Sequence, residues 1–272
     1  MSTRSVVQLE SKAAGSKAVE SPNFNTLRVH NRLCYAYWGG TVTVGAAVLI
    51  YSAYCTIVGN TEFSWLAFAL LTSITAAFSL KLPKSEIRVS VPDVFIFSSI
   101  LLFGPAIGAL TAAMEGLTGS LRARTKSRRF RFASFNMTAM SLSAYAAGKI
   151  YEYFRPQTAN TLAYGGRFQP LVFSLLILAL SYFVLNTGLL AAMIALDKHV
   201  HAVQVWMQYF SWMSVAYLAA ALMAGILFIT AQAIMPTTLA LLLIVPVSTY
   251  VAYRHVLRLM SENISLKEKA VP

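Results

Sequence analysis

Long apolar runs alternate with short polar segments along most of the chain. Each run approaches or exceeds the roughly 18–20 residues that an α-helix needs to cross a bilayer. The pattern predicts an all-α, polytopic transmembrane helical bundle at residues 34–257. We expect a flexible cytoplasmic N-terminal tail at 1–33 and a cytoplasmic C-terminal tail at 258–272. The apolar runs are 34–58, 63–81, 94–121, 132–154, 169–196, 211–231 and 236–257.

The third run is interrupted by Gly104-Pro105. Proline removes a backbone donor and clashes with the preceding helical turn, and it pushes the residue before it out of the α region. We therefore expect residues 92–121 to form a two-armed hairpin, giving seven full spans or eight counting the short first arm. That arm is too short to cross a core about 30 Å thick, so it is either a re-entrant half-helix or a short span over a thin site. Irregular backbone at this depth must be buried inside the bundle.

Composition and charge support this topology. Hydrophobic residues make up 57% of the chain and charged residues 12%, whereas soluble domains carry about 25% charged residues. The net charge of +12 comes from basic residues that flank the apolar runs. The hairpin threading places 19 of the 22 Lys and Arg residues in the cytoplasm, two in the external 155–168 loop and Lys149 in a span. This distribution follows the positive-inside rule and predicts a multi-pass protein of a bacterial inner membrane, with both termini cytoplasmic and no nucleic-acid partner.

The second arm of the hairpin carries small residues at every fourth position. They form a ridge on which another helix can pack closely, although the same groove can also admit a ligand or a partner helix. Pro105 begins this arm. The ridge consists of Gly104, Gly108, Ala112, Gly116 and Ser120.

Two carboxylates, Asp93 and Glu115, fall within or at the edge of the hydrocarbon. Each would cost about 2.5–3.5 kcal/mol at the centre of a span, so such residues face the interior and find polar partners. Asp93 follows Pro92 and could instead cap the first arm. Glu115 has no capping role, which leaves a polar contact in the bundle or a contact with a ligand.

Asn136, Asn186 and Thr187 lie deep in later apolar runs. Hydrogen bonding between helices is the simpler interpretation of these polar residues. Together with the two carboxylates, they could also orient a small-molecule or lipid ligand in an otherwise apolar pocket.

The remaining polar residues indicate neither catalysis nor a metal or other cofactor. HExxH, GxSxG and Walker A motifs are absent from the sequence, so we predict no enzyme activity. Asp197, His199 and His201 sit on an amphipathic connector at 197–210, where an interfacial surface is the better interpretation. Cys34 and Cys55 lie near opposite ends of one run, so we expect no disulfide. The basic segment 122–131 suits anionic head groups, and Lys149 should pair with Glu152.

Residues 90–122, SVPDVFIFSSILLFGPAIGALTAAMEGLTGSLR, resemble the membrane-embedded N-terminal sensor region of bacterial HD-GYP and HD-domain phosphohydrolases and of some GGDEF proteins. That region is itself similar to the substrate-binding subunits of energy-coupling factor vitamin transporters. The shared features are Asp93, the LLFGP turn, the Gly108-Ala109 pair and Glu115. YFVLNTGLLAAMIAL at 182–196 is also similar to the sensor group.

The resemblance implies a ligand-sensing or ligand-binding bundle. We expect a non-catalytic sensor that signals through its C-terminal helix to a cytoplasmic partner. We expect no phosphohydrolase or cyclase domain to follow YRHVLRLMSENISLKEKAVP. We therefore expect either a separate signalling partner or a truncated or stand-alone relative of the sensor group. The alternative is the substrate-binding subunit of a vitamin-type transporter, with a coupling subunit on the small-residue ridge. A structural membrane protein without a ligand is the third interpretation.

Overall fold

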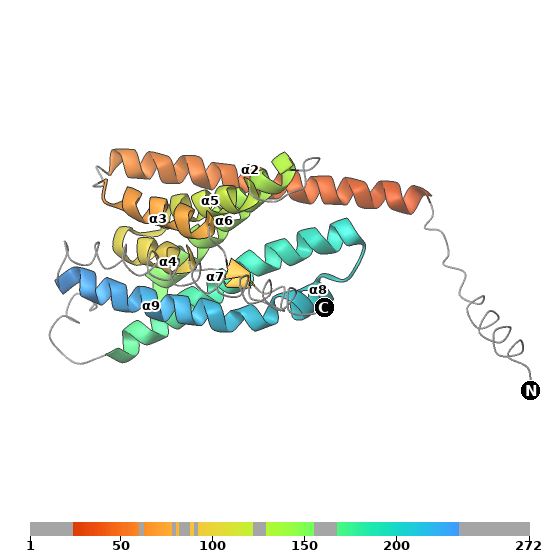
Figure 1. Cartoon of the computed structure of the whole chain (residues 1–272). Helices are drawn as coiled ribbons and strands as arrows, with labels where there is room; N and C mark the ends of the chain where they lie inside the picture. Colours follow the sequence, from red (N-terminus) through yellow and green to blue (C-terminus); the bar gives the residue numbers. More distant parts are fainter. Residues whose placement is uncertain are drawn as a thin grey trace, which may run out of the picture.

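The computed structural model describes residues 24–59, 63–77, 80–81, 88–89, 92–121, 129–154 and 168–233. Within these residues the protein is almost entirely helical (Figure 1). The structure does not describe residues 1–23 of the predicted N-terminal tail, the predicted last span at 236–257, the predicted C-terminal tail, the 155–167 part of the predicted external loop or the basic residues 122–128. Residues 24–33, predicted to belong to the flexible tail, are helical instead. The helices are α2 (Phe24–Val58), α3 (Trp65–Ala77), α4 (Pro92–Phe103), α5 (Pro105–Leu121), α6 (Arg129–Phe154), α7 (Phe168–Lys198), α8 (Ala202–Tyr209), the 3-10 helix η2 (Ser211–Met213) and α9 (Ser214–Ala233).

Two boundaries differ from those of the apolar runs. Helix α2 begins at Phe24, before the predicted start at residue 34, because a helix can continue through polar residues that contain no proline or glycine. Helix α3 ends at Ala77, and Leu80–Lys81 (β1) then pairs antiparallel with Arg88–Val89 (β2). The described part of the chain therefore adds one short strand pair to an otherwise helical protein.

Three described helices contain segments that are long and apolar enough to cross a membrane, namely Arg32–Val58, Leu171–Lys198 and Ser214–Ala231. Large apolar side chains on these helices face outward, among them Ile57 and Val215. An extended apolar exterior would be unfavourable in water. These helices therefore indicate a membrane-embedded protein.

Helices α2 and α6 run parallel to each other. At one end, Trp38 Nε1 donates a hydrogen bond to the carbonyl oxygen of Arg131 at 3.0 Å. Further along both helices, the rings of Tyr51 and Tyr145 meet edge to face with centroids 6.1 Å apart. Both contacts advance in the same direction, as the charge-based threading predicts.

Helices α7 and α9 run antiparallel. Asn186, late in α7, bonds to Tyr217, early in α9. Leu175, early in α7, lies against Gly225 later in α9, where an added Cβ would come within 2.5 Å of its Cδ1. These relative directions also agree with the predicted threading.

The predicted hairpin forms at Gly104-Pro105. Gly104 has a φ of +91°, a conformation that glycine adopts without a Cβ penalty, and Pro105 begins the next helix, where a missing donor does no harm. The arms pack against each other, with Thr111 Oγ1 3.2 Å from Ser99 Oγ. Gly108 lies so close to Ile100 that an added Cβ would overlap its Cγ1. The chain therefore reverses its direction at this point.

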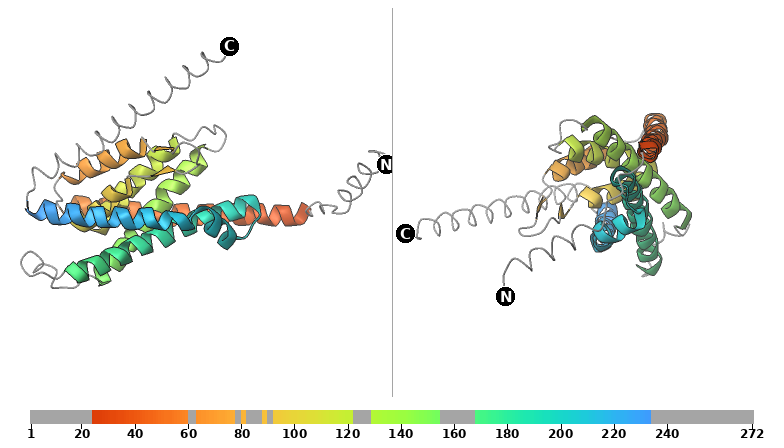
Figure 2. Two further views of the ribbon diagram at one scale, coloured as in Figure 1. Left: turned by 60° about the horizontal axis from the view of Figure 1, so that its bottom comes forward. Right: turned by 90° about the vertical axis from the view of Figure 1, so that its right-hand side faces the viewer.

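The hairpin lies inside the bundle. Nine of the 12 residues of helix α4 are buried, among them Asp93, Ser98 and Ser99, as expected of a helix surrounded by protein. It packs against α3, α5 and α9, while α5 also packs against α2 and α6. Figure 2 shows this arrangement from two further directions. At 12 residues, α4 is about 18 Å long, which is shorter than a hydrocarbon core of about 30 Å.

The hairpin can be tested by cross-linking. We expect cysteines at positions 99 and 111, with Cys34 and Cys55 replaced by serine, to join through a short thiol cross-linker, because the native oxygens are 3.2 Å apart. In a continuous helix, positions twelve apart would lie about 18 Å from each other. Mobility on denaturing gels before and after reduction measures the product. A cysteine pair at 99 and 119 is the control, and equal cross-linking of both pairs would contradict the hairpin.

Candidate functional site

The open end of the hairpin carries both predicted carboxylates. Asp93 lies in the first turn of α4 and is 5% exposed, and Glu115 is partly buried on α5. The contacts of Ser99 with Thr111 and of Ile100 with Gly108 set the register of the two arms, and they put Asp93 and Glu115 at about the same level along the hairpin. Asp93 follows Pro92 inside the helix, so it is not the capping residue considered from the sequence. A carboxylate in the first turn still interacts favourably with the helix dipole.

Two tyrosines from other helices are close enough to these carboxylates to interact with them electrostatically. Tyr182 on α7 is fully buried, and Tyr217 on α9 is nearly so. Both hydroxyl groups interact electrostatically with Asp93 and with Glu115. Four helices thus bring acidic and phenolic groups to one place.

The hydrogen bonding of the two hydroxyl groups differs. Asn186 Nδ2 donates to Tyr217 Oη at 3.1 Å. Among the described residues, Tyr182 Oη is buried without a hydrogen-bond partner. Buried polar groups are nearly always paired, so each exception calls for an explanation. We refer to Asp93, Glu115, Tyr182, Asn186 and Tyr217 as the buried polar cluster.

Aromatic rings form a wall around this cluster. Phe97 meets Tyr182 edge to face at 5.3 Å between centroids, and Phe183 lies 5.4 Å from Tyr217. Phe183 also contacts Trp206 of α8 at 5.5 Å. The wall is held by hydrogen bonding, because Trp206 Nε1 donates to Thr187 Oγ1 at 2.8 Å. The polar groups therefore sit in an apolar, largely aromatic surrounding.

The predicted site residues do not all meet. Asp93, Glu115 and Asn186 belong to the buried polar cluster, and Thr187 supports the aromatic wall through Trp206. Asn136 lies on another seam, where its Nδ2 donates to Ser120 Oγ at 3.3 Å. Its backbone there packs against Gly116. Asn136 therefore joins α6 to α5 by a hydrogen bond between helices, the simpler interpretation of this residue.

The predicted ridge is taken up by contacts within the chain. Ala112 is fully buried, and Gly108 packs against Ile100 of α4. Gly116 packs against the α6 backbone at Asn136 and Met137. Most of the ridge is therefore covered by α4 and α6.

Sequence reasoning missed the tyrosines of the cluster. A signal was present, because Tyr182 and Asn186 are four residues apart and so share one face of a helix. Tyr217 carried no comparable signal, since its position opposite Asn186 depends on how α9 is rotated against α7.

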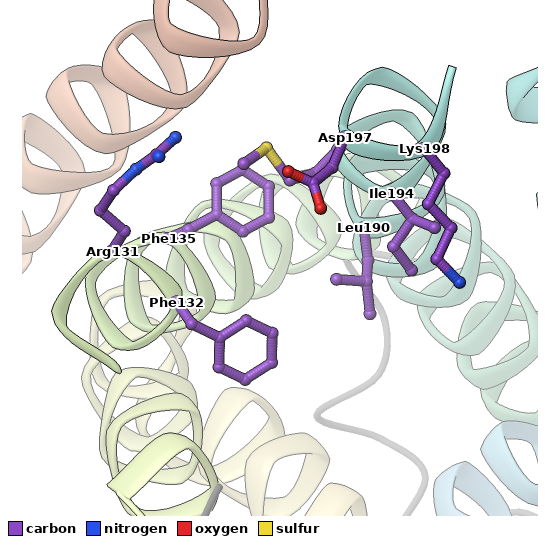
Figure 3. A pocket seen from close by; sticks show the side chains of 8 residues that line it. Arg131, Phe132, Phe135, Leu190, Ile194, Asp197 and Lys198 are labelled. Carbon is purple, nitrogen blue, oxygen red and sulfur yellow. The ribbon is translucent and has the colours of Figure 1, made fainter. Parts of the chain in front are cut away.

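An open groove of about 170 Å³ lies elsewhere, between the start of α6 and the end of α7 (Figure 3). None of the predicted ligand residues lines it. The Arg131 guanidinium lies 4.2 Å from the ring centroid of Tyr35. The lining of the groove combines apolar side chains with the charged residues Arg131, Asp197 and Lys198. Its lining residues are Arg131, Phe132, Phe135, Leu190, Met193, Ile194, Asp197 and Lys198.

The described residues also settle the positions of the other candidates, namely the possible metal ligands, the two cysteines and one ion pair. Asp197, His199 and His201 are exposed, and no group of three His, Cys, Asp or Glu residues that could hold a metal occurs in the described part of the chain. Both cysteines are free. The predicted Lys149–Glu152 ion pair is confirmed at 2.8 Å.

Comparison of the chain with protein-family models, with curated proteins and with solved structures finds no match.

Proposed function

We propose that this protein is a non-catalytic membrane module that binds a small ligand at the buried polar cluster. One observation carries the proposal: the Tyr182 hydroxyl is fully buried, interacts electrostatically with two carboxylates and, among the described residues, has no hydrogen-bond partner. Leaving such a group unpaired costs about 1–3 kcal/mol. A ligand that supplies its partner would remove this cost.

The membrane arrangement forms part of the proposal. We place the chain in a bacterial inner membrane with seven or eight membrane segments, with the hairpin as two buried arms and both termini in the cytoplasm. The parallel and antiparallel helix directions described above support this threading, as does the placement of Lys and Arg in the sequence.

The proposed signal leaves the buried polar cluster through α9. Tyr217 connects the cluster to α9, because its hydroxyl accepts a hydrogen bond from Asn186. Occupancy of the cluster would shift α9 and the chain that follows it, and a cytoplasmic signalling partner would respond. The alternative, a transporter subunit, needs a surface for its coupling partner. The small-residue ridge is a poor surface for one, because α4 and α6 already cover Gly108 and Gly116.

Substitution Tyr182→Phe separates binding from folding. Without ligand, we expect its free energy of unfolding to equal or exceed that of the wild type by about 1 kcal/mol, because the variant no longer buries an unpaired hydroxyl. We expect ligand retention to fall about tenfold, as the loss of one hydrogen bond worth about 1.4 kcal/mol implies. Chemical unfolding in detergent and native mass spectrometry measure the two quantities.

Tyr217→Phe is the matched control, since it removes the same hydroxyl from the neighbouring tyrosine. It leaves Asn186 Nδ2 without its acceptor, so we expect a loss of about 1–3 kcal/mol in stability. If Tyr182→Phe were equally destabilising and retained its ligand fully, the Tyr182 hydroxyl would be structural and the proposal would be wrong.

A further inference from the structure

We infer that the groove between α6 and α7 binds one anionic phospholipid, with its phosphate near Arg131 and Lys198 and an acyl chain along the apolar lining. This site is separate from the buried polar cluster and would exist whether or not the cluster binds a ligand. The groove has a volume of about 170 Å³. A single water molecule needs only about 10–15 Å³ of such a cavity, so the groove can accept part of a larger molecule.

The part of the groove away from the helix ends is apolar. Phe132 of α6 and Leu190 of α7 point toward each other across it (Figure 3), and Phe135 and Ile194 also line it. Leu190 and Lys198 are about 12 Å apart along the axis of α7, so the apolar lining extends well away from the charged end. Water in an apolar groove finds few hydrogen-bond partners. An acyl chain needs none and therefore fits this lining better.

The other part of the groove, at the helix ends, is charged. Arg131 lies in the first turn of α6, and Asp197 and Lys198 are the last residues of α7. The Arg131 guanidinium lies 4.2 Å from the ring centroid of Tyr35 and 5.6 Å from that of Trp38. Such contacts use the face of the guanidinium, whereas its N–H donors lie in its plane. The lining carries two positive charges against the single negative charge of Asp197, which also makes an interaction of its own.

The surroundings of the groove favour a negatively charged ligand as well. This end of the bundle contains the start of α6, the open end of the hairpin and the strand pair that precedes the hairpin. Basic residues outnumber acidic ones among the residues described there. In the proposed threading this end lies at the cytoplasmic leaflet, whose anionic lipids are attracted to basic residues beside membrane-spanning helices. Besides the groove residues, Arg32, Lys81, Arg88 and Arg129 lie at this end, against Asp93 and Glu115.

The test offers lipids to the purified full-length protein after detergent washing has removed its bound lipid. We expect native mass spectrometry to show one phosphatidylglycerol per chain. Its retention should exceed that of phosphatidylcholine with the same acyl chains by at least about fivefold, the factor that one basic residue near an anionic lipid contributes. Diacylglycerol, which lacks the phosphate, and glycerol 3-phosphate, which lacks the chains, should not be retained.

Substitutions in the groove locate the lipid. Lys198→Gln and Arg131→Gln should each lower phosphatidylglycerol retention about fivefold, and Leu190→Trp should abolish it because the indole fills the groove. Lys149→Gln, which removes a basic residue near the other end of α6, is the matched control and should retain the lipid fully. Glu115→Gln should also retain it, which distinguishes this lipid from a ligand of the buried polar cluster. The unfolding midpoint in detergent shows that each variant is folded.

Equal retention of phosphatidylglycerol and phosphatidylcholine, or of diacylglycerol, would mean that the groove accepts any apolar chain and would overturn the inference. Equal retention of glycerol 3-phosphate would overturn it by assigning the site to a soluble phosphate. Unchanged retention in both Lys198→Gln and Leu190→Trp would place the lipid elsewhere on the protein. None of these results depends on Glu115, so each would leave the function proposed for the buried polar cluster standing.

Discussion

Replacing Gly116 with valine will destabilise the protein by about 3 kcal/mol, the upper part of the usual range for overpacking. A Cβ at this position would lie 2.8 Å from the carbonyl oxygen of Asn136 and from Cα of Met137. Those atoms belong to the α6 backbone, which cannot move aside as a flexible side chain would. Helices α5 and α6 would have to separate, and the hairpin would lose its packing in the bundle. Chemical unfolding in detergent measures the change.

Gly119→Val on the same helix is the matched control. Among the described residues, no atom lies within 4 Å of a Cβ added at Gly119. Only helix propensity therefore changes, and the free energy of unfolding should move by less than about 0.5 kcal/mol. Equal stability losses in the two variants would mean that α5 does not pack on α6 in the register described.

Glu115→Gln will lower ligand retention by about 10- to 100-fold while keeping the size of the side chain. Hydrogen bonds to charged groups contribute about 1.5–3 kcal/mol, and each 1.4 kcal/mol is a factor of ten in affinity. Native mass spectrometry of protein purified in parallel from the same membranes measures the bound fraction at several protein concentrations.

The control for this change is Glu152→Gln, which removes an exposed carboxylate paired with Lys149. Its ligand retention should match that of the wild type. If Glu115→Gln also matched the wild type in both retention and stability, Glu115 would not belong to the site.

The hairpin was predictable because its cause is local. Gly104-Pro105 interrupts the helical hydrogen bonding locally, and irregular backbone at membrane depth must be covered by protein. The burial of α4 follows from these two facts together with the basic segments on either side of the hairpin. Lys149 and Glu152 were predictable for the same reason, since residues three apart on one helix are neighbours.

The assembly of the site was only partly predictable. Each polar residue in an apolar run was recognisable as a candidate, but its partner depends on the rotation of one helix against another. Asn136 faces Ser120, whereas Asn186 faces Tyr217. These outcomes are set by close contacts between helices, such as that of Gly116 with the α6 backbone. A single sequence does not encode such contacts in a pattern that can be read locally.

Helix α9 contributes to the buried polar cluster and is followed in the sequence by the C-terminal part of the chain. It packs against both α4 and α7, and it supplies Tyr217 to the cluster. A ligand held between the hairpin and α7 would therefore contact the helix that leads toward the C-terminal part of the chain. On the proposed function, occupancy of the cluster would therefore act on α9 directly.

Native mass spectrometry of the wild-type protein, released gently from freshly prepared membranes, tests the central claim most directly. We predict a mass excess that corresponds to one small molecule per chain and that disappears in Glu115→Gln but persists in Glu152→Gln. A wild-type spectrum with no retained molecule, or one with the same excess in all three proteins, would contradict ligand binding at the buried polar cluster.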